Sequence, residues 1–146
     1  MRYNRQTDSF DIIPELVGIF VYDIKEDTSG NLWLATYVCG VFRYDVSKKE
    51  WKNYVHNEKD EKSLSNNKVL SVFEDSRRNV WLTTQGRGIC LFHPETENFT
   101  RYDTGNGLPN DVVYQIAEDE DGVFWLTTNN GLARFDLTSG AVKVYT

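Results

Sequence analysis

A block of similar residues occurs three times along the chain, and this repeat limits the fold more than any other feature of the sequence. Aligned on tryptophan, the three blocks read EDTSGNLWLAT, EDSRRNVWLTT and EDEDGVFWLTT. Trp33 and Trp81 are 48 residues apart, and Trp81 and Trp125 are 44 residues apart. Repeats of roughly 40–50 residues are typical of the four-stranded blades of a β-propeller.

Each repeat contains four short runs with the composition of β-strands. An apolar run precedes Glu-Asp, the tryptophan lies in the second run, and a glycine precedes the third run, which reads VFRYD, ICLFH or LARFD. A fourth run, at 51–54, 99–102 and 142–145, ends each repeat. The runs are rich in Val, Ile and aromatic residues and are separated by Gly, Asn, Asp or Ser, and no segment has a helical period over ten residues. The sequence therefore predicts an all-β fold, a β-propeller segment of four-stranded antiparallel blades.

The chain is predicted to start in the middle of a blade. Its first residues, Arg2-Tyr3-Asn4 and Phe10 to Ile13, match the third and fourth runs of the later repeats. We assign residues 1–13 to the closing strands of a preceding blade, and we assign three complete blades to 14–54, 55–102 and 103–146. Because propellers close with roughly 4–8 blades, we expect the chain to belong to a larger propeller or to self-associate.

Composition excludes several classes of partner. The formal net charge of −6 argues against nucleic acid, because phosphate binding needs an excess of Lys and Arg on one face. No window approaches the roughly 18 consecutive apolar residues of a membrane span, so we expect no direct membrane contact, and the first ten residues do not resemble a signal peptide. Cys39 and Cys90 occupy non-equivalent places in the repeats, which predicts neither a disulfide framework nor a metal site. We predict no cofactor.

The connections between runs differ in how strictly their lengths are kept. In an antiparallel meander, the first-to-second and third-to-fourth connections share one face of the ring, and the remaining connections share the other. On the first of these faces, Asp and Trp are six residues apart in every repeat. On the other face the lengths vary, and the segment from Trp125 to Gly131 is one residue shorter than its two equivalents. Scaffolds usually carry function on variable loops, so we expect a ligand on that face.

Five residues in the second-to-third connections are the candidate ligand-binding residues. They differ among the repeats and offer an aromatic ring, amides and a guanidinium, groups that suit a polyol or a carboxylated sugar. These residues are Tyr37, Gln85, Arg87, Asn129 and Asn130. The alternative is that they are ordinary polar turn residues.

Other conspicuous residues are better explained by the scaffold. Trp33, Trp81 and Trp125 are assigned to the structural core and not to sugar stacking, because they recur at the same strand position. The acidic segment 119–122 is interpreted as an Asp-initiated turn and not a calcium loop, because the equivalent turn of the second repeat carries two arginines.

The two histidines bear on catalysis. His56 and His93 are predicted at opposite ends of the blades, so they do not form an acid–base pair, and we predict no catalytic residues.

The order of these features closely resembles the two-component regulator propeller repeat. The matching residues are the Val/Ile run, Glu-Asp, the Gly/Asn turn, Trp-Leu-x-Thr, the glycine, Arg-Phe/Tyr-Asp, and Gly107-Leu108-Pro109 before the next strand. The chain departs from this pattern at Arg78, where the other repeats have Gly30 and Gly122.

This resemblance implies a function. Such repeats form the extracytoplasmic sensors of hybrid histidine kinases, which commonly detect oligosaccharides and control transcription of the matching utilisation genes. By resemblance, the chain is a non-enzymatic, periplasmic sensor segment of a membrane-anchored protein, with an oligosaccharide as its ligand. The alternative function is a structural or protein-interaction propeller, and a lyase-type propeller is disfavoured by the separated histidines.

Overall fold

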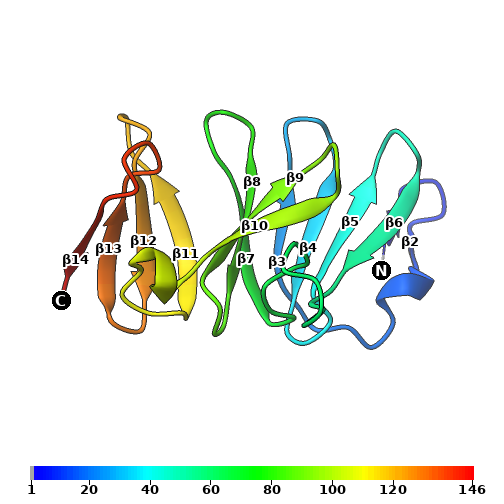
Figure 1. Ribbon diagram of the computed structural model, residues 1–146. Coiled ribbons are helices and arrows are strands. Elements are labelled where there is room, and N and C mark those ends of the chain that lie inside the picture. Colours follow the sequence, from blue (N-terminus) through cyan, green and yellow to red (C-terminus); the bar gives the residue numbers. More distant parts are fainter. Residues whose placement is uncertain (1) are drawn as a thin grey trace.

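The protein is described here by a computed structural model that covers residues 2–146, which form antiparallel sheets only, with two short 3-10 turns (Figure 1). Each of three sheets has four strands in sequential order, which confirms the predicted all-β propeller fold. Blade 1 contains β3 (Val21–Glu26), β4 (Leu32–Thr36), β5 (Val41–Asp45) and β6 (Glu50–Tyr54). Blade 2 contains β7 (Val69–Glu74), β8 (Val80–Thr84), β9 (Ile89–His93) and β10 (Asn98–Tyr102). Blade 3 contains β11 (Val113–Glu118), β12 (Phe124–Thr128), β13 (Gly131–Phe135) and β14 (Val142–Tyr145).

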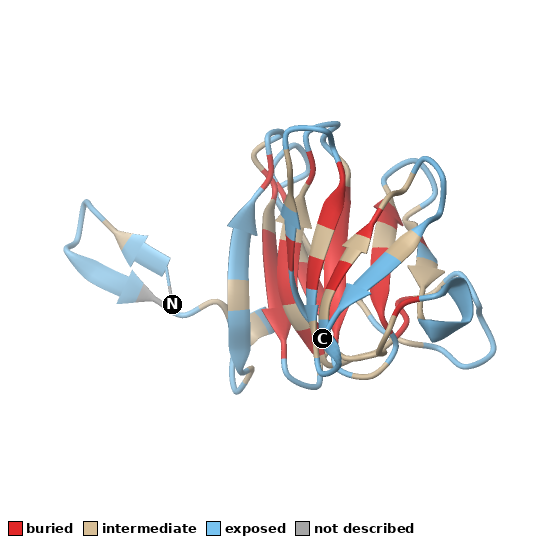
Figure 2. Ribbon diagram, turned by 90° about the vertical axis from the view of Figure 1, so that its left-hand side faces the viewer, coloured by how far each residue is buried: buried red, intermediate tan, exposed pale blue. Residues whose placement is uncertain are grey.

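A separate hairpin precedes blade 1. It pairs β1 (Arg2–Asn4) with β2 (Ser9–Asp11), and the turn η1 (Pro14–Leu16) links it to the first blade. A second 3-10 turn, η2 (Thr104–Asn106), lies between blades 2 and 3. The hairpin forms a two-stranded sheet of its own that stands apart from the three blades (Figure 2), and its assignment to the closing strands of a preceding blade stays a prediction. No helix among residues 2–146 is long and apolar enough to cross a membrane.

The constant spacing between Asp and Trp has a hydrogen-bond origin. In blade 2, the Asp75 carboxylate accepts bonds from the backbone N–H groups of Arg77 (2.9 Å) and Asn79 (2.8 Å). It also accepts from Asn79 Nδ2 (3.0 Å) and from Trp81 Nε1 (2.9 Å). The Asp-to-Trp bond and the bonds to the turn N–H groups recur in blades 1 and 3. One carboxylate therefore fixes both the turn and the tryptophan, and any other spacing would break this unit.

The glutamate before that aspartate joins neighbouring blades. Glu74 accepts from the backbone N–H of Thr28 (2.9 Å) and from its hydroxyl (3.3 Å), across the boundary between blades 1 and 2. Glu118 accepts from the N–H and the hydroxyl of Ser76, both at 2.7 Å, across the next boundary. The repeated Glu-Asp pair thus ties each turn to the following blade.

A glycine opens the third strand of each blade because the fourth strand ends against it. At Gly88, where φ is 68°, a Cβ would overlap the backbone carbonyl of Tyr102. Gly40 and Gly131 have positive φ and the same close approach to the last strand of their blades.

The hydrophobic core lies between the blades, where buried residues of facing sheets meet. Trp33 (1% exposed) packs edge-on against Phe92, and Trp81 (2% exposed) packs edge-on against Phe124. Trp125 was also expected in the core but is only half-buried. It points to the opposite side of β12 from the buried Phe124, toward the face of blade 3 that no other described blade covers.

Candidate functional site

The connections between strands divide the molecule into two faces. We call the face with the β3–β4, β5–β6 and equivalent connections the turn face. We call the opposite face, with the β4–β5, β8–β9 and β12–β13 turns and the segments between blades, the loop face (Figure 1). The five predicted ligand-binding residues all lie in the three loop-face turns.

A threonine builds each loop-face turn. The hydroxyl of Thr36 donates to the carbonyl of Gly40 at 2.7 Å, and Thr84 and Thr128 make the same bond in blades 2 and 3. The same hydroxyl accepts a backbone N–H from within the turn, for example that of Arg87 at 3.2 Å. The Trp-Leu-x-Thr motif therefore holds the turn backbone, and the intervening residues are free to vary.

The first strand of each blade carries an irregularity at the same face. Its pairing with the second strand shifts by one residue between Val21 and Asp23, and at the equivalent places in β7 and β11. The extra residues are Tyr22, Leu70 and Tyr114. A bulge of this kind re-aims a side chain, and in blades 1 and 3 the bulged tyrosine contacts the neighbouring loop-face turn.

In blade 1 this contact forms an aromatic pair. The rings of Tyr22 and Tyr37 meet edge-on with centroids 5.5 Å apart, and the Lys68 ammonium lies 5.4 Å from the Tyr37 ring centroid. Tyr22 is 54% exposed and Tyr37 39% exposed, so both rings border solvent. Lys68 comes from the segment that leads into blade 2, so this cluster spans two blades.

In blade 2 the turn is docked onto the next blade through its backbone. The N–H groups of Gly86 and Gly88 donate to the carbonyl of Asp111 at 3.1 and 2.7 Å. Gln85 forms an isolated antiparallel β-bridge with Val112. Both Gln85 and Arg87 are exposed. No ion pair within residues 2–146 engages the Arg87 guanidinium.

In blade 3 the two predicted asparagines have separate contacts. The Tyr114 hydroxyl donates to Asn129 Oδ1 at 2.5 Å, and Asn130 Nδ2 reaches the carbonyl of Pro109 at 3.5 Å. Both asparagines are exposed.

The predicted residues thus form three separate groups on the loop face, one in each blade. No hydrogen bond or ring contact within residues 2–146 joins one of the five directly to another. Tyr22, Lys68 and Tyr114, which contact the predicted residues of blades 1 and 3, were not predicted from the sequence. The sequence shows these aromatic and basic residues within or beside the first apolar run of each blade. It does not show the one-residue bulge that re-aims the two tyrosines.

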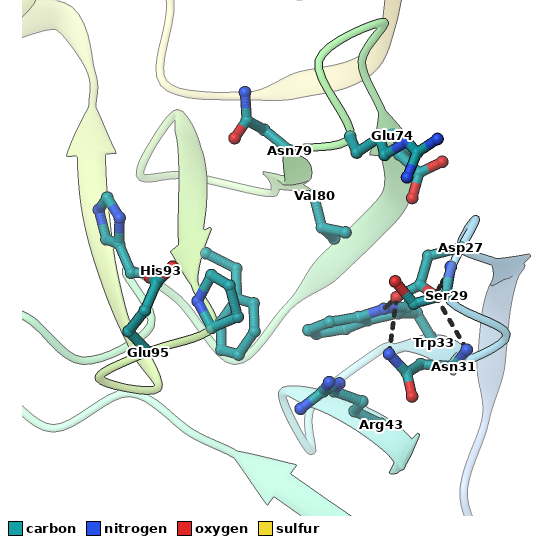
Figure 3. A pocket seen from close by; sticks show the side chains of 13 residues that line it. Asp27, Ser29, Asn31, Trp33, Arg43, Glu74, Asn79, Val80, His93 and Glu95 are labelled. Carbon is teal, nitrogen blue, oxygen red and sulfur yellow. Dashed lines mark hydrogen bonds between the residues drawn. The ribbon is translucent and has the colours of Figure 1, made fainter. Parts of the chain in front are cut away.

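The turn face holds a cavity of about 230 Å³ between blades 1 and 2 (Figure 3). Trp33, Asn31 and Arg43 of blade 1 face Asn79, His93 and Glu95 of blade 2 across it. The guanidinium of Arg43 lies 5.4 Å from the Trp33 ring centroid and 5.6 Å from that of Phe92. No binding role was predicted for this face from the sequence.

An ion-pair network closes the outer side of this blade boundary. Lys52 Nζ donates to Glu97 Oε1 at 2.6 Å, and the Tyr54 hydroxyl donates to the same oxygen at 3.1 Å. The bond from Lys52 lowers the pKa of Glu97, and the same bond raises the pKa of Lys52. Arg43 is a weaker partner, with NH1 3.8 Å from Glu97 Oε1.

The histidines lie on different faces. His56 follows the end of β6 on the loop face, where Nδ1 is 2.8 Å from the carbonyl of Leu64. His93 ends β9 on the turn face, with Nε2 2.7 Å from the Thr100 hydroxyl. Within residues 2–146, no three His, Cys, Asp or Glu side chains gather to hold a metal ion.

Comparison with known sequences identifies the repeat. Residues 15–38, 63–86 and 107–130 match the two-component regulator propeller. The three repeats belong to this family. A histidine kinase of Formosa agariphila is 34% identical over an alignment of 201 residues, which covers 98% of this chain and 14% of the kinase. The chain therefore spans a small part of this relative.

Solved structures share the fold of this propeller segment. The extracellular domain of a hybrid two-component system from Bacteroides thetaiotaomicron superimposes with a TM-score of 0.81 at 24% identity, over 99% of this chain and 20% of that domain. Virginiamycin B lyase from Staphylococcus aureus gives a TM-score of 0.65 at 21% identity, over 86% of this chain and 41% of the lyase. At these identities the two likenesses establish the fold alone.

Proposed function

We propose that the chain is a segment of the extracytoplasmic sensor propeller of a hybrid two-component system, and that its loop face binds an oligosaccharide signal. The repeat family and the likeness to a histidine kinase support the sensor role. In the complete, membrane-anchored protein the propeller would lie in the periplasm, and binding would control transcription of utilisation genes.

One observation carries the site. The three loop-face turns share the threonine-to-glycine bond, yet the side chains on this common backbone change from Tyr37 to Gln85 and Arg87 and then to Asn129 and Asn130. Variation on a constant frame is what a surface selected for a ligand requires.

The side chains of these three groups suit a sugar ligand. The exposed edge of the Tyr22–Tyr37 pair offers an aromatic surface for the C–H groups of a sugar ring, and Lys68 beside it offers a hydrogen-bond donor. The Arg87 fork can hold a carboxylate or sulfate through two parallel bonds. Amides at Gln85, Asn129 and Asn130 can both donate to and accept from hydroxyl groups.

The test belongs in the complete sensor. We expect Tyr37→Ala combined with Arg87→Ala to abolish calorimetric binding and ligand-dependent signalling, with a melting temperature close to that of the wild type because both side chains are exposed. Arg77→Ala, which removes an exposed arginine from the turn face, is the matched control and should bind normally. Binding that survives the loop-face pair but is lost with Arg77→Ala would show that the wrong face was chosen.

A protein-interaction propeller is the second candidate function. It is favoured by the apolar side chains on the outer face of blade 1, such as Ile24 at 61% exposure, and by the half-buried Trp125 on blade 3. These surfaces fit the rest of a larger propeller or a second copy of the chain. A module of this kind would keep its partner in the Tyr37 and Arg87 variant and lose it when Trp125 is changed.

No enzymatic activity is proposed. An acid–base mechanism would need titratable groups gathered at one site, and the two histidines lie on opposite faces.

A further inference from the structure

Blade 2 departs from the repeat at several turn-face positions, and these departures line one cavity. The first is Arg78, which lines the cavity between blades 1 and 2. Its equivalents are Gly30 and Gly122, with φ of 84° and 76°. Arg78 holds the same left-handed backbone at φ 66°, which a residue with a Cβ adopts at a cost. The turn therefore carries a side chain that its own geometry disfavours.

The second departure is His93. Its equivalents Asp45 and Asp136 cap the turn between the third and fourth strands, for example through the Asp45 carboxylate, which accepts from the backbone N–H groups of Ser47 and Lys48. His93 instead contacts the Thr100 hydroxyl on the neighbouring strand. Blade 2 has thus given up this side-chain cap and placed an imidazole at the cavity wall.

The gap in front of blade 2 is also larger than the equivalent gap in front of blade 3. Val80 opens β8 where Phe124 opens β12, and both residues line the turn-face gap in front of their blade. The gap between blades 1 and 2 is about 230 Å³, whereas the equivalent gap between blades 2 and 3 is about 40 Å³. Phe124 fills the second gap by packing on Trp81 at 5.1 Å between ring centroids.

The charged side chains that line the cavity differ in how many hydrogen-bond and ion-pair partners they have. Asp27 accepts four hydrogen bonds from its own turn and Trp33, and Glu74 is engaged by Thr28. Arg43, whose equivalent in blade 2 is Leu91, has NH1 3.7 Å from the carboxylate of Asp45 and 3.8 Å from that of Glu97, while its buried Nε has no hydrogen-bond partner in the described part of the chain. Arg78 is exposed, like Glu95, and has no ion pair within residues 2–146. Glu95 is exposed at the rim, where water screens its charge.

We propose that this turn-face cavity is a second binding site, for a small polar molecule that carries a carboxylate or sulfate group. Arg78 and Arg43 supply the guanidinium donors for the anion, and Asn31, Asn79 and His93 border the rest of the molecule (Figure 3). A volume of about 230 Å³ is below the roughly 300–1,000 Å³ of sites for drug-sized ligands, which limits the occupant to about one sugar ring. The site lies on the opposite face from the proposed oligosaccharide site and does not depend on it.

The experiment titrates the full chain with D-glucuronate and glucose 6-sulfate, and with D-glucose as the uncharged match, while amide chemical shifts are followed by NMR. Concentrations of about 10 mM suffice for a Kd of roughly 1 mM. We expect both anions to shift the amides of residues 27–31, 78–80 and 93–95, and glucose not to do so. The relative affinity of the two anions separates a carboxylate site from a sulfate site.

Restoring the repeat supplies the decisive variant. Arg78→Gly should weaken anion binding by about tenfold or more, the loss typical of a charge-assisted bond, and should not lower the melting temperature, because glycine is favoured at this φ. His93→Asp should also weaken binding, because it restores the turn cap and adds a negative charge. Arg77→Gly removes the neighbouring exposed arginine, which does not line this cavity, and should bind as the wild type does.

Three results would overturn the proposal. The first is that neither anion shifts the amide signals of residues 27–31, 78–80 and 93–95. The second is that glucose shifts them as much as the anions do. The third is that Arg78→Gly binds the anions within about twofold of the wild type. Loss of the loop-face site in the complete sensor leaves these measurements unaffected, so the two proposals fail separately.

Discussion

Replacing Gly88 with alanine tests the feature that packs the third strand of a blade against the fourth. Gly88 has φ 68°, and the atoms that a Cβ would meet are the carbonyl oxygen and carbon of Tyr102 and the Cα of Asp103. All three are backbone atoms, so no side chain can rotate away to make room. The backbone of Gly88 also donates to the carbonyl of Asp111, which holds the loop-face turn on blade 3.

The expected cost has two parts. A left-handed backbone costs a residue with a Cβ about 1–2 kcal/mol. Forcing extra atoms into a packed region costs about 1–3 kcal/mol, which here means separating the ends of β9 and β10. We therefore expect Gly88→Ala to lower the free energy of unfolding by about 2–5 kcal/mol, measured as a lower urea midpoint at unchanged slope.

Gly140→Ala is the matched control. Gly140 has φ 74°, but a Cβ there has no neighbour within 4 Å, so this variant carries the backbone cost without the overlap. We expect a loss of about 1–2 kcal/mol. Equal losses for the two variants would show that the approach of Gly88 to Tyr102 is relieved freely, and the explanation for the repeated glycine would be wrong.

Two further predictions follow from burial and charge. Trp81→Ala should cost about 3–5 kcal/mol because Trp81 is 2% exposed between blades 2 and 3, whereas Trp125→Ala should cost clearly less; equal urea midpoints for the two variants would contradict this. The Ser47 hydroxyl, followed by the Lys48 N–H, lowers the pKa of Asp45 to about 2, and the bond from Trp125 lowers the pKa of Asp119. Because these folded-state values lie below the unfolded value of about 3.9, the ionised carboxylates stabilise the fold above about pH 4, and this is lost as the pH falls toward 2. Asp45→Asn should flatten the fall in urea midpoint between about pH 5 and pH 2.5, and an unchanged profile would contradict the assignment.

The strands could be predicted from the sequence because local signals mark both ends of each one. The strand β7 ends at Glu74 because the next residue, Asp75, turns its carboxylate back onto the following N–H groups. The six-residue spacing to Trp81 was visible, and its cause, the bond from Nε1 to Asp75, became clear only in the structure. The half-burial of Trp125 was not predictable from the repeat, because its burial depends on a neighbour on the uncovered side of blade 3.

The candidate site was predictable only in part. Strand order placed Tyr37 and Asn129 on the loop face, because the order of antiparallel strands decides on which face a connection lies, and turn composition marked them as candidates. Tyr22 and Tyr114 were missed, because a bulge shifts the pairing by one residue and leaves no mark in a short apolar run. Lys68 was missed because its contact with Tyr37 crosses a blade boundary.

The two faces differ in what a change of residue reveals. On the loop face the threonine-to-glycine bond supports the turn whatever lies between, so a side chain such as Gln85 can be exchanged at little cost to stability. On the turn face the capping aspartates and the positive-φ glycines belong to hydrogen-bonded units or special backbone conformations, so a departure at one of these positions lowers stability unless something compensates. Arg78 in a glycine conformation and His93 in the place of a capping aspartate are departures of this kind, and both border the same cavity. A position where the repeat is broken at a cost is therefore stronger evidence for a ligand than a position where variation is free.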